Sequence, residues 1–354
     1  MKNIKGLRQE LEKHGLDAFL CVQNTRYLTG TDAGKAVIVP QDDAPILICS
    51  RLEYERVRQR SRIRDIRAFS SWKSPLQRGE RVFFLEPWQL IVKCLKELGA
   101  RSVGYDKASR AFIRKLRNAY SASYREKPEI MEDLRKIKSN EELALLSRSA
   151  EIAERGMNRA AELIEPGRTE LEVAAEAEYR MRKLGSSGTP FQTVVASGGN
   201  SWLPHSSATK KKLAKGELIV VDLGANFNGY ASDMTRTFAL APTSKQSKIL
   251  QIVKRAQLAA LAKVRSGAKA MEVDAAARSV IERAGYAKFF THSTGHGVGL
   301  EIHELPSLAP NSKDILKRGM VITVEPGVYL PNVGGARWED MLVVTKDGYR
   351  LLTL

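Results

Sequence analysis

The first 130 residues alternate between short apolar runs and segments in which apolar residues recur every three or four positions. The runs are typical of buried β-strands, and the longer segments are typical of helices that bury one face. The alternation predicts an α/β amino-terminal domain. Its predicted strands are Ala18–Val22, Ala36–Val39, Ile46–Cys49, Arg64–Ala68, Val82–Leu85, Val103–Tyr105 and Ala122–Tyr124. Its predicted helices are one containing Ile4, Leu7 and Leu11, followed by Leu52–Arg60, Trp88–Leu98 and Ser109–Ala119.

The pattern changes near Lys127 and Pro128, which predicts two domains, 1–127 and 128–354. The second domain begins with two capping boxes, in which a Ser or Thr is followed three residues later by a Glu, and such pairs start helices. Its predicted helices run from Ser139 to about Ile164, from Thr169 to just before Gly185, from Gln246 to Val264 and from Met271 to Ala284. Its predicted strands are 218–223, 230–238, 321–325 and 334–344. The order is helix pair, strands, helix pair, strands, which indicates an internal repeat.

Four carboxylates end or interrupt these apolar strands, and a histidine lies in a glycine-rich segment between them. The five residues are Asp222, Asp233, His296, Glu325 and Glu339. Oxygen ligands with a single nitrogen suit a pair of divalent metals rather than a structural zinc, which favours thiolates or more histidines. Two such metals supply a nucleophilic hydroxide at neutral pH, which indicates a hydrolase. The alternative is that the acids form ion pairs with Arg236, Arg337 and other cations, since an unpaired buried charge is costly.

Four of the five histidines fall in two short segments. His205 lies in Leu-Pro-His-Ser-Ser, and the other three lie between residues 292 and 303. Glycines at 295, 297 and 299 let the backbone approach a ligand closely. We therefore assign His205, His292 and His303 to the same site as His296.

These motifs resemble those of the pita-bread metallopeptidase superfamily, and most of all its proline-specific branch of Xaa-Pro dipeptidases (prolidases) and aminopeptidase P. The resemblance spans nearly the whole chain. The similar stretches are Asn24–Gly30, Pro204–Ser206, Val221–Ala225, Gly229–Thr237, His292–Glu304, Gly319–Gly327 and Gly334–Asp340. One departure is Trp338, which stands where a smaller aliphatic residue is commoner. The resemblance implies an α/β amino-terminal domain followed by an α+β pita-bread catalytic domain.

The resemblance also implies a role for each site residue. Asp222 would bind one metal, Asp233 and Glu339 would bridge two metals, and His296 and Glu325 would complete the second. A metal-bridging hydroxide would attack the X–Pro bond, with Glu325 as general base. His205, His292 and His303 would hold the substrate and stabilise the tetrahedral intermediate. Arg337 would either orient Asp222 or reach the substrate carboxylate. Mn or Co is expected, with Zn as a further possibility.

Several functions stay open at this point. Hydrolysis of Xaa-Pro dipeptides is favoured, and an Xaa-Pro aminopeptidase acting on longer peptides is the first alternative. The long amino-terminal domain argues against methionine aminopeptidase, and the complete ligand set argues against a metal-free, creatinase-like amidinohydrolase. A polyanion-binding relative, for example one that binds RNA, is a different class. We also expect a homodimer whose amino-terminal domain limits substrate length, with the turn-rich segment Asn24–Thr31 near the cleft.

Composition supports a soluble, cytoplasmic protein. The chain has 354 residues, 43% of them hydrophobic, and a mean hydropathy of −0.29. No run approaches the ~20 apolar residues of a membrane span, and we expect neither a signal peptide nor a membrane partner. Cys21, Cys49 and Cys94 are expected to be buried free thiols. No phosphate-binding glycine loop follows the first strand, so no nucleotide cofactor is expected.

The net charge of +17 is the feature that favours a polyanionic partner. Residues 1–130 contain 26 Lys and Arg against 15 Asp and Glu, and Arg51–Arg67 is the densest basic stretch. A solvated basic face is the simpler interpretation, because no aromatic stacking platform accompanies it. Nucleic acid is therefore not expected as a partner.

Overall fold

The structure, a computed structural model, describes residues 2–353. These residues form two compact units that divide between Leu134 and Arg135. The predicted boundary at Lys127 and Pro128 coincides with the start of a helix, α6 (Pro128–Lys136), which continues across the division. The sequence patterns did not predict this helix. Its first residue is proline, which suits a helix start because the first helical N–H groups have no partner within the helix.

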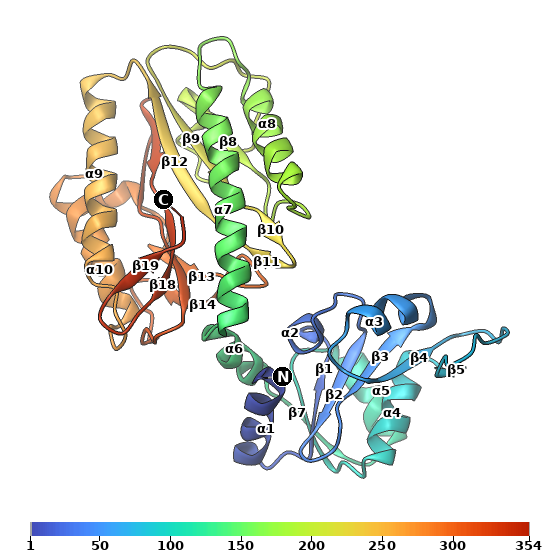
Figure 1. Cartoon of the computed structure of the whole chain (residues 1–354). Coiled ribbons are helices and arrows are strands. Elements are labelled where there is room, and N and C mark those ends of the chain that lie inside the picture. The colour runs from blue at the N-terminus through green and yellow to red at the C-terminus, as the bar shows by residue number, and fades with distance from the viewer. Residues whose placement is uncertain (1, 354) are drawn as a thin grey trace. The chain divides into compact units, whose positions relative to one another are not determined.

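The amino-terminal unit is built on one seven-stranded sheet, in the order β5-β4-β3-β2-β1-β6-β7. Helices pack against this sheet (Figure 1), so the predicted α/β architecture is confirmed. The strands are β1 (Ala18–Cys21), β2 (Ala36–Pro40), β3 (Ile46–Ser50), β4 (Asp65–Phe69), β5 (Val82–Phe83), β6 (Ser102–Tyr105) and β7 (Ser123–Glu126). The helices are α1 (Lys2–His14), α2 (Thr25–Thr29), η1 (Arg51–Glu53), α3 (Tyr54–Arg60), α4 (Pro87–Glu97) and α5 (Arg110–Ala119).

The segment after β1 differs from the expectation. We predicted a turn-rich stretch at Asn24–Thr31, but Thr25–Thr29 form the short helix α2, which ends at Gly30 with φ 81°. A positive φ is readily adopted by glycine. The chain before this helix is held by Asp106, whose buried carboxylate accepts the backbone N–H groups of Val22, Gln23 and Asn24 at 2.9–3.0 Å.

The second unit contains two helix pairs and the strands between and after them (Figure 1). The helices are α7 (Asn140–Glu162), α8 (Glu170–Lys183), α9 (Ser244–Leu261) and α10 (Ala270–Arg283), with the short turns η2 (Gly198–Asn200) and η3 (Ala287–Phe289). The strands are β8 (Val194–Ser197), β9 (Glu217–Leu223), β10 (Asn226–Phe227), β11 (Tyr230–Ala231), β12 (Met234–Leu240), β13 (Gly295–Gly297), β14 (Glu304–Leu308), β15 (Val321–Val324), β16 (Gly327–Leu330), β17 (Gly334–Arg337), β18 (Asp340–Val344) and β19 (Tyr349–Leu351).

Within residues 2–353, four helices begin at reciprocal capping boxes. In each, the side chain of the residue before the helix accepts the backbone N–H of the third helical residue, and that residue's side chain accepts the backbone N–H of the residue before the helix. The capping residues are Glu86 before α4, Ser139 before α7, Thr169 before α8 and Thr243 before α9. The two boxes predicted from the sequence, at Ser139 and Thr169, are confirmed.

The second unit repeats its backbone. The first half has a sheet of order β12-β9-β8, and the second half has β14-β13-β15-β18-β19. In each half, the residue just before the second helix forms an isolated β-bridge with a residue that comes later in the chain. The pairs are Thr169 with Lys212 in the first half and Lys269 with Ile315 in the second. The first strand of each half, β8 or β13, pairs antiparallel with the strand that carries the next apolar run. Ser197 of β8 pairs with Ile219 of β9, and Gly297 of β13 pairs with Ile322 of β15. The predicted internal repeat is therefore present at the level of strand register.

Two of the predicted strands are broken. The returning strand 230–238 is divided into β11 and β12, with Ser232 and Asp233 between them. The strand 334–344 is divided into β17 and β18, with Trp338 and Glu339 between them. Apolar residues continue on both sides of each break, so periodicity alone does not reveal it. In both breaks an acidic residue lies outside the strand, so its backbone is not restricted to the strand conformation.

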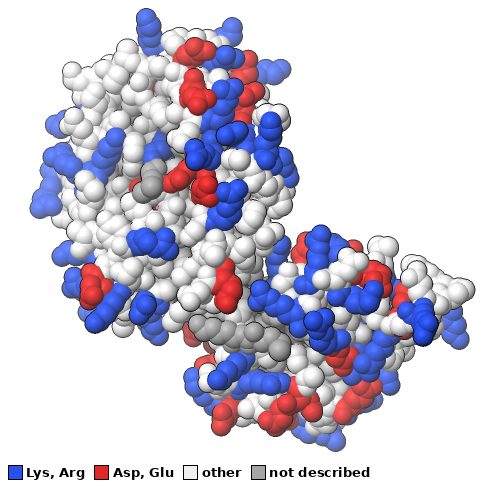
Figure 2. All heavy atoms as spheres, viewed as in Figure 1, with Lys and Arg blue, Asp and Glu red and all other residues white. Residues whose placement is uncertain are grey.

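Four of the seven arginines in the basic stretch Arg51–Arg67 form ion pairs with acids. On the face shown in Figure 2, Lys and Arg are interspersed with Asp and Glu in both units. Within the basic stretch, the ion pairs are Arg51–Glu80, Arg56–Asp32, Arg56–Glu53, Arg58–Glu55, Arg67–Asp65 and Arg67–Glu97. These contacts favour the interpretation of a solvated, salt-bridged surface over a polyanion site.

Candidate metal centre

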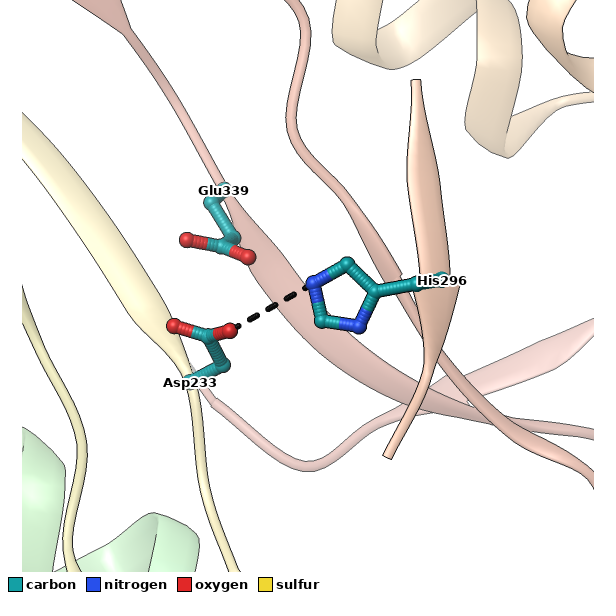
Figure 3. Close-up of side chains that lie close together, drawn as sticks. All are labelled: Asp233, His296 and Glu339. Carbon is teal, nitrogen blue, oxygen red and sulfur yellow. Dashed lines mark ion pairs between the residues drawn. The ribbon is translucent and has the colours of Figure 1, made fainter. Parts of the chain in front are cut away.

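The two halves of the second unit bring distant carboxylates and one histidine together. Asp233 comes from the break before β12, His296 from the middle of β13, and Glu339 from the break before β18. One ligand atom from each of these three residues lies within 4.8 Å of the other two. The three side chains point toward one another (Figure 3). Nε2 of His296 lies 3.6 Å from a carboxylate oxygen of Asp233.

The other two predicted ligands border this group. Glu325 follows β15, its backbone N–H donates to Thr294 O, and its Oε1 lies 3.4 Å from His296 Nε2. Asp222 is the sixth residue of β9 and pairs in register with Thr235. Its Oδ2 accepts from the guanidinium of Arg337 at 2.5 Å.

Close backbone contacts at two glycines allow this approach. A Cβ at Gly224 would lie 2.0 Å from the carbonyl oxygen of Ser232, and one at Gly295 would lie 2.1 Å from that of Thr323. Neither distance is possible for a side chain, so only glycine fits. The first contact brings the chain after Asp222 against the residue before Asp233. The second seats β13, with His296, against β15.

Burial and mutual repulsion dominate the electrostatics. Burial, followed by the charges of Glu339, Asp222 and Glu325, holds the pKa of Asp233 well above its ordinary value. Burial, followed by the charges of Glu325 and Asp222, does the same to the pKa of Glu339. Burial raises the pKa of Glu325 to about 8, and Asp222 adds to this against the opposing charge of Arg337. Such clustered acids favour either protons or cations between them.

Two oxygens of the site are buried and have no hydrogen-bond partner among the described residues, Asp222 Oδ1 and Glu339 Oε1. A buried oxygen without a partner is costly, and a bound cation would satisfy it. The donor set, carboxylate oxygens with one imidazole nitrogen, suits Mn, Co or Zn. The residues present therefore fit a divalent metal.

Arg337 organises one side of the group. Its side chain is 4% exposed and donates to Asp222, to Thr235 Oγ1 at 3.1 Å and to Tyr329 OH at 2.7 Å. Burial works against the charge of Arg337, but Tyr329, Asp222 and Glu325 keep its pKa above the ordinary value. Of the two predicted roles, the contacts favour orientation of Asp222. Among the described residues, Asp222 is the one predicted ligand that pairs with an arginine or lysine, because Arg236 pairs with Asp340 instead.

The other three histidines assigned to the site, His205, His292 and His303, interact with residues of the same group. The rings of His296 and His303 are 4.4 Å apart, edge to face. Burial and the neighbouring His296 and His205 lower the pKa of His303. His292 Nε2 lies 2.9 Å from Tyr329 OH, and burial followed by the charge of Arg337 lowers the pKa of His292 to about 4. His292 is therefore neutral at pH 7.

A buried ionic network positions the segment that carries His303. The carboxylate of the next residue, Glu304, accepts from Arg135 and, at 3.2 Å, from Lys138 Nζ. The side chains of Lys138 and Glu304 are 1% and 6% exposed. Burial lowers the pKa of Lys138, so the ion pair with Glu304 is needed to keep it charged. The loop before β14 is thereby fixed to the segment that enters α7.

Sequence reasoning missed two residues of the site. Tyr329 on β16 joins His292 to Arg337 through its hydroxyl. Thr235 on β12 donates to Glu339 Oε2 at 2.7 Å and accepts from Arg337. Thr235, two residues after Asp233, lies within the similar stretch Gly229–Thr237. Tyr329, four residues after Glu325, lies just beyond the stretch Gly319–Gly327. A polar side chain inside an apolar strand was the available signal.

The fold and the grouped ligands define a metallopeptidase of the pita-bread class. Residues 144–346 match the family model for metallopeptidase family M24, and residues 3–137 match that for the creatinase/prolidase N-terminal domain. The chain belongs to metallopeptidase family M24. The predicted superfamily, the two-domain fold class and the assignment as a metallopeptidase are confirmed.

Relatives of similar length include an Xaa-Pro dipeptidase of Pyrococcus horikoshii, 35% identical over 99% of this chain and 97% of the relative. Among solved structures, an Xaa-Pro dipeptidase from Bacillus anthracis has a TM-score of 0.91 at 34% identity, covering 100% of this chain and 97% of the other. An X-Pro aminopeptidase from Thermotoga maritima has a TM-score of 0.87 at 29% identity, covering 99% and 97%.

Two further expectations can be compared with the structure. Cys21, Cys49 and Cys94 are buried and free, as predicted. In the part of the chain that the structure describes, no helix has the length and apolar character needed to cross a bilayer.

Proposed function

We propose that this protein hydrolyses the X–Pro bond of Xaa-Pro dipeptides with two bound divalent metal ions. The observation that carries the proposal is the grouping of Asp233, His296 and Glu339 within one family M24 fold. Xaa-Pro dipeptidases among the full-length relatives support the substrate class. An Xaa-Pro aminopeptidase remains the second candidate, since one such enzyme shares the fold over nearly the whole chain.

The proposed ligands are the five predicted ones. Asp233 and Glu339 are the proposed bridging ligands, because a carboxylate can bridge two ions, whereas an imidazole nitrogen has one lone pair to give. Asp222 would complete one ion, and His296 with Glu325 the other, with Mn or Co as the expected ions. When bound, the ions supply a nucleophile at neutral pH and stabilise the negative charge that develops on the scissile carbonyl.

The protein's own groups handle protons and orientation. Glu325 is proposed as the general base, because a carboxylate beside a metal-bound nucleophile can take up its proton and return it to the leaving nitrogen. His205 and His303 are proposed to donate to the substrate and to the tetrahedral intermediate. Neutral His292 donates its Nδ1–H to Ser293 O and accepts from the Tyr329 hydroxyl through Nε2, so it is proposed to help hold the substrate by positioning Tyr329. Arg337 holds Asp222 in the orientation that ligation needs.

A substrate with proline after the scissile bond requires its own form of recognition. The X–Pro bond has no N–H, so strand-like docking cannot use that donor. We propose that the amino-terminal domain limits substrate length and that the chain works as a homodimer. Segment Asn24–Thr31, held by Asp106, is the proposed contact region. The three buried free thiols fit a reducing, cytoplasmic setting.

The experiment compares Ala-Pro, Ala-Pro-Ala and Ala-Ala with the metal-stripped protein and after addition of Mn²⁺, Co²⁺ or Zn²⁺. We expect metal-dependent cleavage of Ala-Pro, little cleavage of Ala-Pro-Ala and none of Ala-Ala. Preferred cleavage of the tripeptide would establish the aminopeptidase instead. Cleavage that survives complete chelation would overturn the metal-dependent assignment.

A further inference from the structure

Trp338 stands in the break between β17 and β18, directly before Glu339, and two cations lie against its ring. Lys254 Nζ, from α9, is 3.8 Å from the ring centroid, and the Arg236 guanidinium carbon, from β12, is 4.8 Å from it. Both distances are within the range of attractive cation–π contacts. The indole also packs against the large apolar cluster beneath α9 and α10.

Arg236 contacts three consecutive residues of this segment. Besides the ring of Trp338, it donates to the carbonyl oxygen of Glu339 at 2.5 Å and to Asp340 Oδ1 at 2.6 Å. Asp340 is fixed in turn, because its other oxygen accepts from Gln257 at 2.7 Å. One guanidinium therefore contacts the side chains on both sides of Glu339 as well as the Glu339 carbonyl oxygen.

The backbone of Glu339 depends on the contacts of Arg236 because the residue lies outside the strands and their hydrogen bonds. Its N–H donates to Thr235 O at 3.1 Å, and its carbonyl is held by Arg236. Its carboxylate is held by Thr235 through one oxygen only. A shift of the Arg236 guanidinium would therefore move a proposed bridging ligand.

Lys254 has no ion pair with a carboxylate among the described residues, and the π face of Trp338 is the partner it contacts. Burial followed by the charge of Arg236 lowers the pKa of Lys254, which shows that the two cations act on each other. A smaller aliphatic residue at position 338 would leave these like charges without the negative ring face that attracts both. The arrangement thus depends on the aromatic ring itself as well as on its volume.

We propose that Trp338 is a positioning residue: together with Lys254 it fixes the Arg236 guanidinium, and through it the orientation in which Glu339 meets the metals. The inference rests on the metal-ligand role proposed for Glu339. Trp338 is also the residue at which this chain departs from the resemblance noted above. The proposal makes it a determinant of metal affinity that acts through Arg236.

The test measures the Mn²⁺ dissociation constant of metal-stripped protein by titration calorimetry, and kcat and KM for Ala-Pro. Trp338→Leu should weaken Mn²⁺ binding by about 10-fold and lower kcat, with KM within about 2-fold, given the strength of desolvated cation–π contacts. Trp338→Phe, which keeps a π face, should restore most of the affinity. Lys254→Met should cost about 3-fold, whereas Lys248→Met, an exposed lysine on the same helix, should have no effect.

The double variant Trp338→Leu/Lys254→Met should bind Mn²⁺ no more weakly than Trp338→Leu alone, because Lys254 acts through the ring. An unchanged Mn²⁺ dissociation constant in Trp338→Leu, with only a lower thermal midpoint, would overturn the proposal. Strictly additive losses would also overturn it. The Mn²⁺ titration is independent of substrate, so a failure to cleave Ala-Pro contradicts the proposed function without deciding this inference.

Discussion

The two halves of the catalytic unit share a backbone but differ in chemistry. Ser197 pairs with Ile219 in the first half as Gly297 pairs with Ile322 in the second. One residue earlier on the first strands, Ala196 corresponds to His296. The first half therefore presents a methyl group where the second presents an imidazole.

The same register makes Asp222 the counterpart of Glu325, each three residues beyond its paired isoleucine. The shorter Asp222 is held by Arg337, whereas the longer Glu325 reaches His296. The repeat therefore supplies one carboxylate per half at equivalent places. The asymmetry of the site arises from side-chain length and from the single histidine.

Each half also fixes its second helix to its first strand with a buried carboxylate, but at different positions. Glu170, at the start of α8, accepts from the backbone and hydroxyl of Ser197 at 2.7 Å. Asp274, one turn into α10, accepts from Thr294 and pairs with Arg278. The comparison teaches that a duplicated scaffold can preserve its register while its buried polar contacts are replaced.

The largest expected effect comes from the ligands that join the halves. Asp233→Asn and Glu339→Gln should lose bound metal and nearly all hydrolysis of Ala-Pro, because each removes a charge from between the two proposed ions. Metal content by elemental analysis and turnover of Ala-Pro measure this. The control is Glu178→Gln, an exposed carboxylate on α8. Full metal content and activity in either site variant would contradict the dinuclear assignment.

The histidines of the two connecting segments provide the next test. His205 lies between β8 and β9, and His303 lies between β13 and β15, at equivalent places in the two halves. His205→Ala and His303→Ala should retain metal and lose about 10²-fold in kcat, as expected for a lost transition-state donor. His292→Ala should also retain metal and lower kcat, because it removes the acceptor of the Tyr329 hydroxyl. Metal loss in His303→Ala but not in His296→Ala would show that the ligand was misassigned.

A smaller effect should separate the two buried carboxylates. Glu170→Gln and Asp274→Asn should each lower the free energy of unfolding by about 2–4 kcal/mol, because charged hydrogen bonds are lost in buried positions. Asp274→Asn should also reduce activity, because Thr294 O accepts the backbone N–H of Glu325. Urea denaturation and Ala-Pro turnover measure both. Equal loss of activity in the two variants would remove the distinction between the halves.

The last prediction concerns the pH dependence of stability in the metal-free protein. The pKa of Glu325 is raised from 4.5 to about 8, so the folded metal-free protein binds a proton that the unfolded chain releases. This contribution to stability is fully present below pH 4.5 and is lost as the pH rises toward 8. Relative to Glu325→Gln, the metal-free protein should lose thermal stability as the pH rises over that window, and thermal midpoints measured from pH 4.5 to 8 record the loss. A parallel pH dependence in both proteins would contradict the shift.

Much of this site was predictable from residue type. Each proposed ligand is a charged or imidazole side chain set in an apolar or glycine-rich segment, which is costly without a partner and therefore informative. The structure adds what spacing cannot give. It shows that Asp233 and Glu339 lie in strand breaks, that α2 replaces an expected turn, and that Tyr329 bridges His292 and Arg337. These features depend on contacts between residues distant in sequence, to which local periodicity is insensitive.

The capping boxes have a consequence for the order of folding. Because α7, α8 and α9 begin at residues whose side chains satisfy their own first turns, their start points are encoded locally. Contacts within each helix pair are also close in sequence and so form at little entropic cost. The ligand group, by contrast, joins residues from 233 to 339 and exists only once both halves have docked. A growing chain would therefore acquire its helices early and its capacity to capture metal at the end, which protects an unfinished protein from binding a cation in the wrong place.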